Sequence, residues 1–247
     1  MKKKKVILVI SAAMAVFGLY GCTDYKNSFT NESNETVSKE EVLITDNENY
    51  SSGEKIDTTY LMLVNKKHNL DEDYVPEDLE YLNISFSGAE SSQYLCKEAA
   101  KALEEMVAAA KNDGINLIGR SGYRSYATQK ATYASKVESL GQEQADRFSA
   151  KAGASEHQTG LAIDIISSEF GKLHTDFQYT ETYKWLTDNC AKYGFILRYP
   201  KGKYDITGYN FEPWHYRYVG VEHAEKIMKE NVTLEEYLYS LSLLDEI

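Results

Sequence analysis

Two short segments, well separated in the chain, carry side chains that could bind a metal and activate water. The first holds His157 and Asp164, and the second holds His215 with Glu212 three positions before it. Two imidazoles and a carboxylate suffice as protein ligands for a catalytic zinc, which keeps a fourth position open for water. The second carboxylate could then take up the proton of that water. Together these residue types are the minimal set of a zinc hydrolase.

The spacing of these residues excludes the common zinc-protease design, in which two histidines lie four apart on one helix. His157 lies in a loop flanked by glycine and alanine, whereas Asp164 lies within the apolar run 161–166, which is typical of a buried strand. A carboxylate inside such a strand is costly to bury alone, and a bound cation is one of the few partners that offset this cost. The alternative is that Asp164 caps a turn or pairs with an arginine, and that His157 is an ordinary loop histidine.

The patterns Ser-x-His-x-x-Gly-x-Ala-x-Asp, which starts at Ser155, and Glu-x-x-His, which starts at Glu212, resemble the signature of the LAS metallopeptidases. The segment Glu-Pro-Trp-His-Tyr-Arg-Tyr-Val-Gly is similar in particular to the VanY-like D-alanyl-D-alanine carboxypeptidase branch. The resemblance extends from about residue 61 to about residue 238, and it includes the segments 121–125 and 193–200 and Gln129.

This resemblance implies roles for individual side chains. It implies that His157, Asp164 and His215 bind one zinc ion per chain, that Glu212 is the general base, and that Arg124 faces the scissile carbonyl. The other residues that we expect at the substrate are Ser121, Tyr123, Gln129, Ser155 and Trp214.

On its own, Arg124 would be interpreted as a solvated loop arginine. At the exit of a strand, next to a zinc site, its guanidinium could instead stabilise the oxyanion that develops on the attacked carbonyl. It could also hold the terminal carboxylate of the substrate in a bidentate grip. The sequence leaves both roles open.

Three functions compete at this point. The resemblance favours a zinc-dependent D,D-carboxypeptidase that removes the terminal D-alanine from the pentapeptide stems of peptidoglycan. The alternatives are an L,D-carboxypeptidase that acts on tetrapeptide stems, and a wall-binding module that keeps the fold without turnover. An intact Glu212 beside a full ligand set argues against the binding module, because a binder needs no base.

The first 22 residues are expected to be a lipoprotein-type signal segment. Four lysines precede an apolar run over residues 6–20 that is too short to span a membrane. The sequence Leu-Tyr-Gly-Cys that follows looks like a bacterial lipobox, in which Cys22 receives the lipid and becomes the new N-terminus. Ordinary signal cleavage and an uncleaved anchor are the alternatives, and all three place the domain outside the cytoplasm. Residues 23–59 are polar and predict a disordered tether.

Residues 60–247 are then expected to form one catalytic domain, which is long enough for a substantial core. The formal net charge falls from -11 to -15 once the four signal lysines are removed. So acidic a chain is a poor candidate for nucleic-acid binding, which depends on neutralising phosphates. We therefore expect a monomer whose partners are peptidoglycan stem peptides and, through the lipid anchor, the membrane.

The hydrophobic periodicity predicts an α+β fold. Strands are expected at 61–66, 115–118, 161–166, 195–199 and 211–219, and helices at 91–111, 126–140, 143–150, 183–193, 222–229 and 234–241. We expect the longer helices to pack on one face of a small, largely antiparallel sheet, with the zinc cleft on the other face. The resemblance implies the same architecture, the LAS or hedgehog-like D-Ala-D-Ala peptidase fold. Pro213 predicts an irregular segment that lets Glu212 and His215 approach one metal.

The remaining histidines and cysteines are expected outside the site. His174, in a polar insertion over residues 167–179, lacks a partner at a useful spacing and is expected to be a lid or surface residue. His68 and His223 are also expected at the surface. Cys96 and Cys190 fall on the apolar faces of predicted helices, which favours two buried thiols, although an exported protein could also join them in a disulfide.

The predicted lipid anchor depends on Cys22. We expect Cys22→Ser to move the protein from the membrane fraction to a soluble or uncleaved form, because the acylated thiol is lost. Cell fractionation with mass spectrometry of the N-terminus measures this change. Unchanged partitioning with no lipid on the wild-type chain would indicate an ordinary signal peptide or an anchor.

Overall fold

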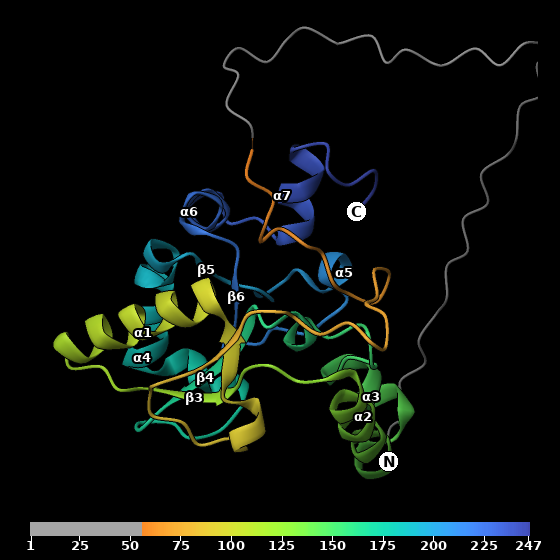
Figure 1. The fold of residues 1–247 in the computed structure, drawn as a ribbon, viewed down its shortest axis with the longest axis horizontal. Helices are drawn as coiled ribbons and strands as arrows, with labels where there is room; N and C mark the ends of the chain where they lie inside the picture. Colours follow the sequence, from red (N-terminus) through yellow and green to blue (C-terminus); the bar gives the residue numbers. More distant parts are fainter. Residues whose placement is uncertain (1–55) are drawn as a thin grey trace, which may run out of the picture. The chain divides into compact units, whose positions relative to one another are not determined.

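A computed structural model describes residues 56–247, and these residues form an α+β fold, as predicted (Figure 1). The signal segment, Cys22 and most of the predicted tether lie outside the described residues. Among the helices of residues 56–247, none is both long enough and apolar enough to cross a membrane.

A four-stranded antiparallel sheet is the centre of the fold. Its strands, in spatial order, are β3 (Leu117–Ser121), β4 (Ala162–Ser167), β6 (His215–Tyr218) and β5 (Phe195–Leu197). Asp164 on β4 is the register partner of His215 on β6 and of Ser121 on β3. Because directly opposed residues of antiparallel strands point to the same face, the register alone brings these three side chains together.

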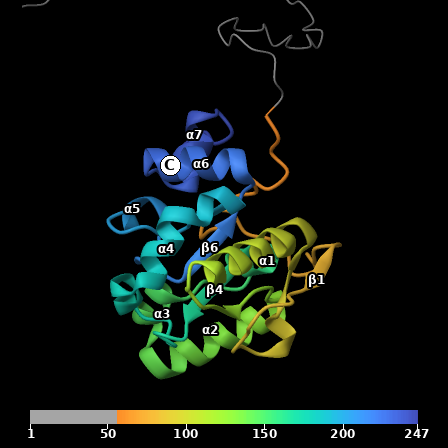
Figure 2. The same cartoon turned by 90° about the vertical axis from the view of Figure 1, so that its left-hand side faces the viewer.

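The two faces of this sheet differ in polarity. Ile163, Ile165 and Tyr216 point into an apolar core that contains residues of helices α1 (Lys97–Asn112) and α4 (Glu181–Asn189). Side chains alternate along a strand, so Asp164 and His215 point to the opposite face. Figure 2 shows α1 lying over the sheet. The predicted division into a helix-covered face and a polar cleft face is therefore confirmed.

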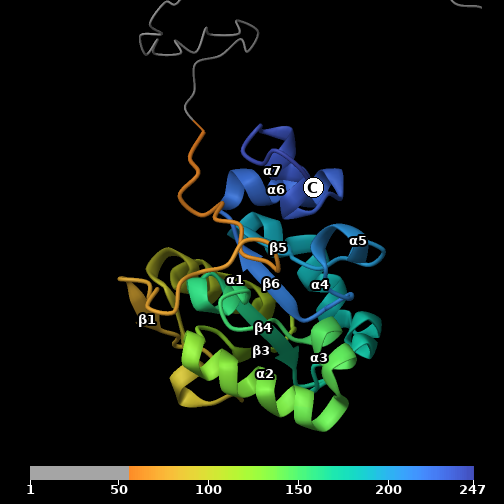
Figure 3. The ribbon, with the colours of Figure 1, turned by 90° about the vertical axis from the view of Figure 1, so that its right-hand side faces the viewer.

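The remaining elements surround the sheet. Helices α2 (Tyr126–Leu140) and α3 (Gln142–Phe148) lie at one end of the domain and border the cleft face, and α6 (Val221–Glu230) and α7 (Leu234–Ser240) lie at the other end (Figure 3). The shorter elements are β1 (Leu79–Tyr81), which pairs with β2 (Tyr94–Cys96), the helix α5 (Tyr204–Thr207), and the 3-10 helices η1 (Glu90–Ser92), η2 (Glu156–Thr159), η3 (Thr175–Tyr179) and η4 (Cys190–Tyr193).

Two predicted elements differ from the structure. Residues 61–66 do not form a strand, because the side chain of Arg217 donates to the carbonyls of Tyr60 and Met62 and so takes the place of a neighbouring strand. The first long helix begins at Lys97 and not at residue 91, because residues 94–96 pair with β1.

The positions of His223, Cys96 and Cys190 also differ in part from those predicted from the sequence. His223 is buried, against the prediction of a surface residue, because its ring contacts the Tyr237 hydroxyl at 2.8 Å and the Asp57 carbonyl at 2.7 Å. Cys96 lies on β2 and not on a helix, whereas Cys190 begins η4. Both cysteines are buried free thiols, and burial raises the pKa of each to about 12.

Candidate metal centre

The three residues expected to bind a metal meet around the carboxylate of Asp164. Its Oδ1 lies 3.1 Å from Nδ1 of His215, and its Oδ2 lies 3.5 Å from Nε2 of His157. One candidate ligand atom from each residue lies within 4.8 Å of the other two, and all three residues are buried. The two imidazole rings are nearly perpendicular, with centroids 5.0 Å apart. The set of two nitrogens and one carboxylate oxygen fits zinc, which takes such ligands in sites with an open position.

In each ring, the nitrogen that does not face Asp164 has its own hydrogen-bond acceptor. This leaves the other nitrogen of each ring with a lone pair directed at the candidate metal position. Nδ1 of His157 lies 2.8 Å from the carbonyl of Gly122, which only accepts, so this nitrogen carries the proton and Nε2 is free. Nε2 of His215 lies 3.4 Å from Oε2 of Glu156, which leaves Nδ1 facing Asp164. Metal-binding histidines usually donate their other N–H to a carbonyl or carboxylate in this way.

The groups around His215 favour its protonated, positively charged form. Burial lowers the pKa of His215, but hydrogen bonds to Asp164 and Glu156 outweigh burial and raise it to about 9. Burial also lowers the pKa of His157, which Asp164 counteracts. A metal ion that binds here must displace the proton of His215, because the ligand is the neutral imidazole.

The turn that carries His157 is short and closely packed. His157 lies on η2, where the sequence predicted a loop, and Gly160 ends this helix with φ +68°. A Cβ added at Gly160 would lie 2.9 Å from Sγ of Cys96. Glycine is therefore needed both for the left-handed conformation and for the close approach of the chain, which leads directly into β4.

Glu212 reaches the centre from outside the sheet. The last strand begins at His215 and not at residue 211, because the His215 amide donates to the Glu212 carbonyl at 3.1 Å and forms a turn through Pro213. The expected irregular segment is therefore present. Oε2 of Glu212 lies 3.9 Å from Nδ1 of His215, on the side of the ring that faces Asp164. Burial raises the pKa of Glu212 to about 8, although His215 lowers it, and such a carboxyl group suits proton transfer near neutral pH.

Arg124 is held by two residues that the sequence also placed at the site. Its Nη1 donates to Oε1 of Gln129 at 2.6 Å, and its Nη2 donates to Oγ of Ser121 at 2.8 Å. The backbone amide of Arg124 donates to the carbonyl of His157 at 3.0 Å, which connects the arginine to the turn that carries this candidate ligand. Burial lowers the pKa of Arg124, and the carboxylates of Asp164 and Glu212 oppose this effect.

Two adjoining cavities run along this face. One, of about 600 Å³, is lined by the three candidate metal ligands, by Glu212 and by three of the expected substrate residues, Gln129, Ser155 and Trp214. The other, of about 510 Å³, is lined by Ser121 and Tyr123, and the two cavities share Arg124 and Asp164. All expected substrate residues therefore line one cleft. His174 is exposed at its rim, at the N-cap of η3, and it is not among the residues that converge on Asp164.

Sequence reasoning gave Glu156 no role. This side chain is buried, and it contacts His215 and two buried arginines, Arg198 and Arg217. The available signal was the two arginines, each of which lies among apolar and aromatic residues at or near a predicted strand. An arginine buried in such a strand needs a carboxylate partner, and Glu156 in the metal-binding motif was a candidate.

Comparisons with known proteins agree with this geometry. Residues 92–221 match the family model VanY: D-alanyl-D-alanine carboxypeptidase. The protein YodJ of Bacillus subtilis (strain 168) is 49% identical over 180 residues, which cover 72% of this chain and 66% of that relative. The chain also covers 57% of a D-alanyl-D-alanine carboxypeptidase of Enterococcus faecium, at 36% identity.

Two solved structures resemble the fold closely. The structure of the LdcB LD-carboxypeptidase is 44% identical, with a TM-score of 0.69, and the match covers 78% of this chain and 94% of that one. A mutant of the vancomycin resistance D,D-pentapeptidase VanY, solved in complex with Zn(II), is 35% identical, with a TM-score of 0.61, over 72% of this chain and 98% of that one.

The antiparallel sheet, with a buried His-Asp-His group and a glutamate beside it, defines a LAS-type metallopeptidase. Within this class, the chain belongs to the VanY family of D-alanyl-D-alanine carboxypeptidases, as the sequence motifs implied.

The convergence of His157, Asp164 and His215 predicts that the protein binds a metal ion. We expect the purified chain to bind about one zinc ion, and we expect Asp164→Asn, His157→Ala or His215→Ala to lose metal and activity together. Elemental analysis after dialysis measures the metal content, and Asp176→Asn is a control because this carboxylate is exposed beside His174. Wild-type metal content in any of the three variants would show that the residue is not a ligand.

Proposed function

We propose that this chain is a zinc-dependent D,D-carboxypeptidase that removes the terminal D-alanine from peptidoglycan pentapeptide stems. The observation that carries the proposal is the position of Glu212, whose carboxylate lies 3.9 Å from the ring nitrogen of His215 that faces Asp164. A wall-binding module would have no use for a buried carboxyl group at that point. The family match and the D-alanine-directed activity in the relatives' names support this choice of substrate.

The residues that would hold the zinc ion are His157, Asp164 and His215. When bound, zinc polarises the scissile carbonyl and lowers the pKa of water at the site. Glu212 accepts the proton of the attacking water and then passes it to the amine of the leaving D-alanine. The free thiols offer no alternative nucleophile among the described residues, because both are buried and burial raises their pKa to about 12.

Arg124 contributes a positive charge in a fixed position. Gln129 and Ser121 each accept from one of its terminal nitrogens, so little freedom is lost when the guanidinium binds a substrate. It donates either to the oxyanion of the attacked carbonyl or to the terminal carboxylate of the stem. Both roles fit a guanidinium that lines both cavities of the cleft.

A second candidate is an L,D-carboxypeptidase that acts on tetrapeptide stems. The observation that favours it is the match to the LdcB LD-carboxypeptidase, which has a higher identity and TM-score than the match to VanY. The two reactions use the same machinery and differ in the length of the stem and in the configuration of the residue before the scissile bond.

The proposal includes a location for the enzyme. Residues 60–247 are the catalytic domain, and residues 23–59 tether it to a lipid on Cys22, so that a monomer works on the wall outside the cytoplasm. The lipobox-like sequence after the apolar run supports this arrangement.

Defined stem peptides distinguish the two activities. We expect release of D-alanine from a pentapeptide stem to be faster than from a tetrapeptide stem, as measured by chromatography of the products. Amidation of the terminal D-alanine replaces a charge-assisted hydrogen bond with a neutral one, so kcat/KM should fall about ten- to a hundredfold. A preference for the tetrapeptide would favour the L,D activity, and cleavage within a longer peptide would contradict both.

Glu212→Gln separates binding from chemistry. The amide keeps the shape of the side chain but cannot accept the proton, so turnover should fall on the order of a hundredfold or more while zinc content and melting temperature are retained. Glu143→Gln, on the exposed surface of α3, is the matched control and should be fully active. Loss of zinc from Glu212→Gln would mean that Glu212 is a ligand and not the base.

A further inference from the structure

Glu156 lies immediately before a metal ligand and is almost completely buried. Its Oε1 accepts from Nε of Arg198 at 2.7 Å and from Nη1 of Arg217 at 2.8 Å. Its Oε2 lies 3.4 Å from Nε2 of His215. Both arginines therefore occupy one oxygen of the carboxylate, and the other oxygen faces the imidazole.

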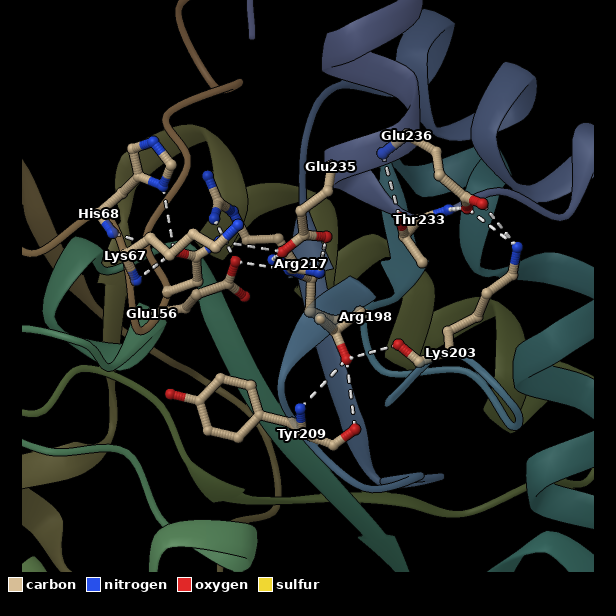
Figure 4. A network of polar contacts seen from close by, with 12 residues as sticks. Lys67, His68, Glu156, Arg198, Lys203, Tyr209, Arg217, Thr233, Glu235 and Glu236 are labelled. Atoms are coloured by element: carbon tan, nitrogen blue, oxygen red, sulfur yellow. Dashed lines mark hydrogen bonds and ion pairs between the residues drawn. The ribbon is translucent and has the colours of Figure 1, made fainter. Parts of the chain in front are cut away.

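The two arginines connect this carboxylate to distant parts of the chain. Nη1 and Nη2 of Arg198 donate to the two oxygens of Glu235 on α7, at 2.8 and 2.7 Å. Glu235 also accepts from Nδ2 of Asn65 at 3.2 Å. The terminal nitrogen Nη2 of Arg217 donates to the carbonyls of two residues in the segment before Asn65. Figure 4 shows Glu156, Arg198, Arg217 and Glu235 gathered in one cluster.

Stability alone does not explain this cluster. Two carboxylates and two guanidiniums are buried, and the free-energy cost of removing them from water cancels most of the attraction between them. Well-packed apolar side chains in their place could therefore stabilise the fold equally well. An apolar side chain at position 156, however, could not accept the proton on Nε2 of His215. The cluster therefore provides what apolar packing cannot, namely a fixed hydrogen-bond acceptor beside the ring of His215.

We propose that Glu156 is a positioning residue, held by Arg198 and Arg217, that fixes His215 in the tautomer and ring orientation that direct its Nδ1 toward Asp164 and the metal. This inference rests on the proposed zinc function. It gives the two arginines and Glu235 a role in metal binding, although none of them lies at the metal.

Glu156→Gln tests the proposal because an amide has only one oxygen. If that oxygen accepts from the two arginines, the amide nitrogen faces Nε2 of His215 and donates to it, which places the proton of the ring on Nδ1. This is the wrong nitrogen for metal binding. We expect the zinc dissociation constant, measured by competition with a chromophoric chelator, to rise about ten- to a hundredfold.

The matched control is Glu236→Gln, which makes the same substitution of a carboxylate by an amide on α7. Glu236 pairs with Lys203 and completes the capping box of Thr233, but it has no contact with Glu156 among those that the structure gives. This variant should lower the melting temperature and leave zinc affinity unchanged. A folded Glu156→Gln chain with zinc affinity within twofold of wild type would overturn the proposal.

The wild-type protein provides a test that does not depend on folding of a variant. In the zinc-loaded chain, 15N NMR of the imidazoles should place the proton of His215 on Nε2, shifted downfield by a carboxylate acceptor, and that of His157 on Nδ1. A proton on Nδ1 of His215, or an Nε2 proton that exchanges freely with water, would overturn the role of Glu156 while zinc binding itself stands. A wild-type chain that binds no zinc would instead overturn the proposed function, and this inference with it.

Discussion

The burial of one carboxylate in the middle of an antiparallel sheet organises this protein. Asp164 has strand partners on both sides, and its side chain is almost completely buried although it faces the cleft. Burial acts to raise its pKa, but His157 and His215 outweigh burial and hold the pKa of Asp164 well below its usual range. A charge in this position requires positive partners at fixed distances, and the register of β4 against β6 supplies one of them directly. The turn before β4 supplies the other.

The burial of Asp164 is matched by where the other site residues lie, on strands or just outside them. Asp164 and His215 are held by ladder hydrogen bonds, whereas Glu212 and Arg124 come from segments just outside strands. Side chains at strand exits can face a cleft while their backbone stays anchored, and here the backbone of Arg124 is bonded to His157 itself. The apolar face of the same strands packs against α1 and α4, so the core behind the candidate metal site supports its geometry.

Local signals in the sequence predicted the local structure well. Helix α2 has the predicted bounds because Ser125 accepts from the amide of Thr128 at its start and Gly141 follows its end. The strand of Asp164 and the irregular turn at Pro213 were also evident from short patterns. What the sequence did not predict depends on contacts between distant residues. Residues 61–66 have the composition of a strand, but the carbonyls of Tyr60 and Met62 accept from an arginine side chain more than 150 positions away.

The same limitation explains why Glu156 was overlooked while its neighbour His157 was not. The histidine belongs to a recognisable spacing of ligands, whereas the glutamate acquires its surroundings only when β5, β6 and α7 assemble around it. No pattern within a single segment identifies such a residue. Two arginines in apolar strands indicate that a carboxylate must be near, but they do not indicate which one.

The contact between Asn65 and Glu235 joins two residues 170 positions apart, and the chain between them contains the candidate metal centre. The segment that defines the family, residues 92–221, contains every candidate ligand but neither of these two residues. A fragment cut to those limits would keep all the groups that touch a metal and would leave Arg198 buried with half of its negative partners missing. A domain that keeps both carboxylate partners of Arg198 must therefore extend to Glu235, beyond the outermost candidate ligands.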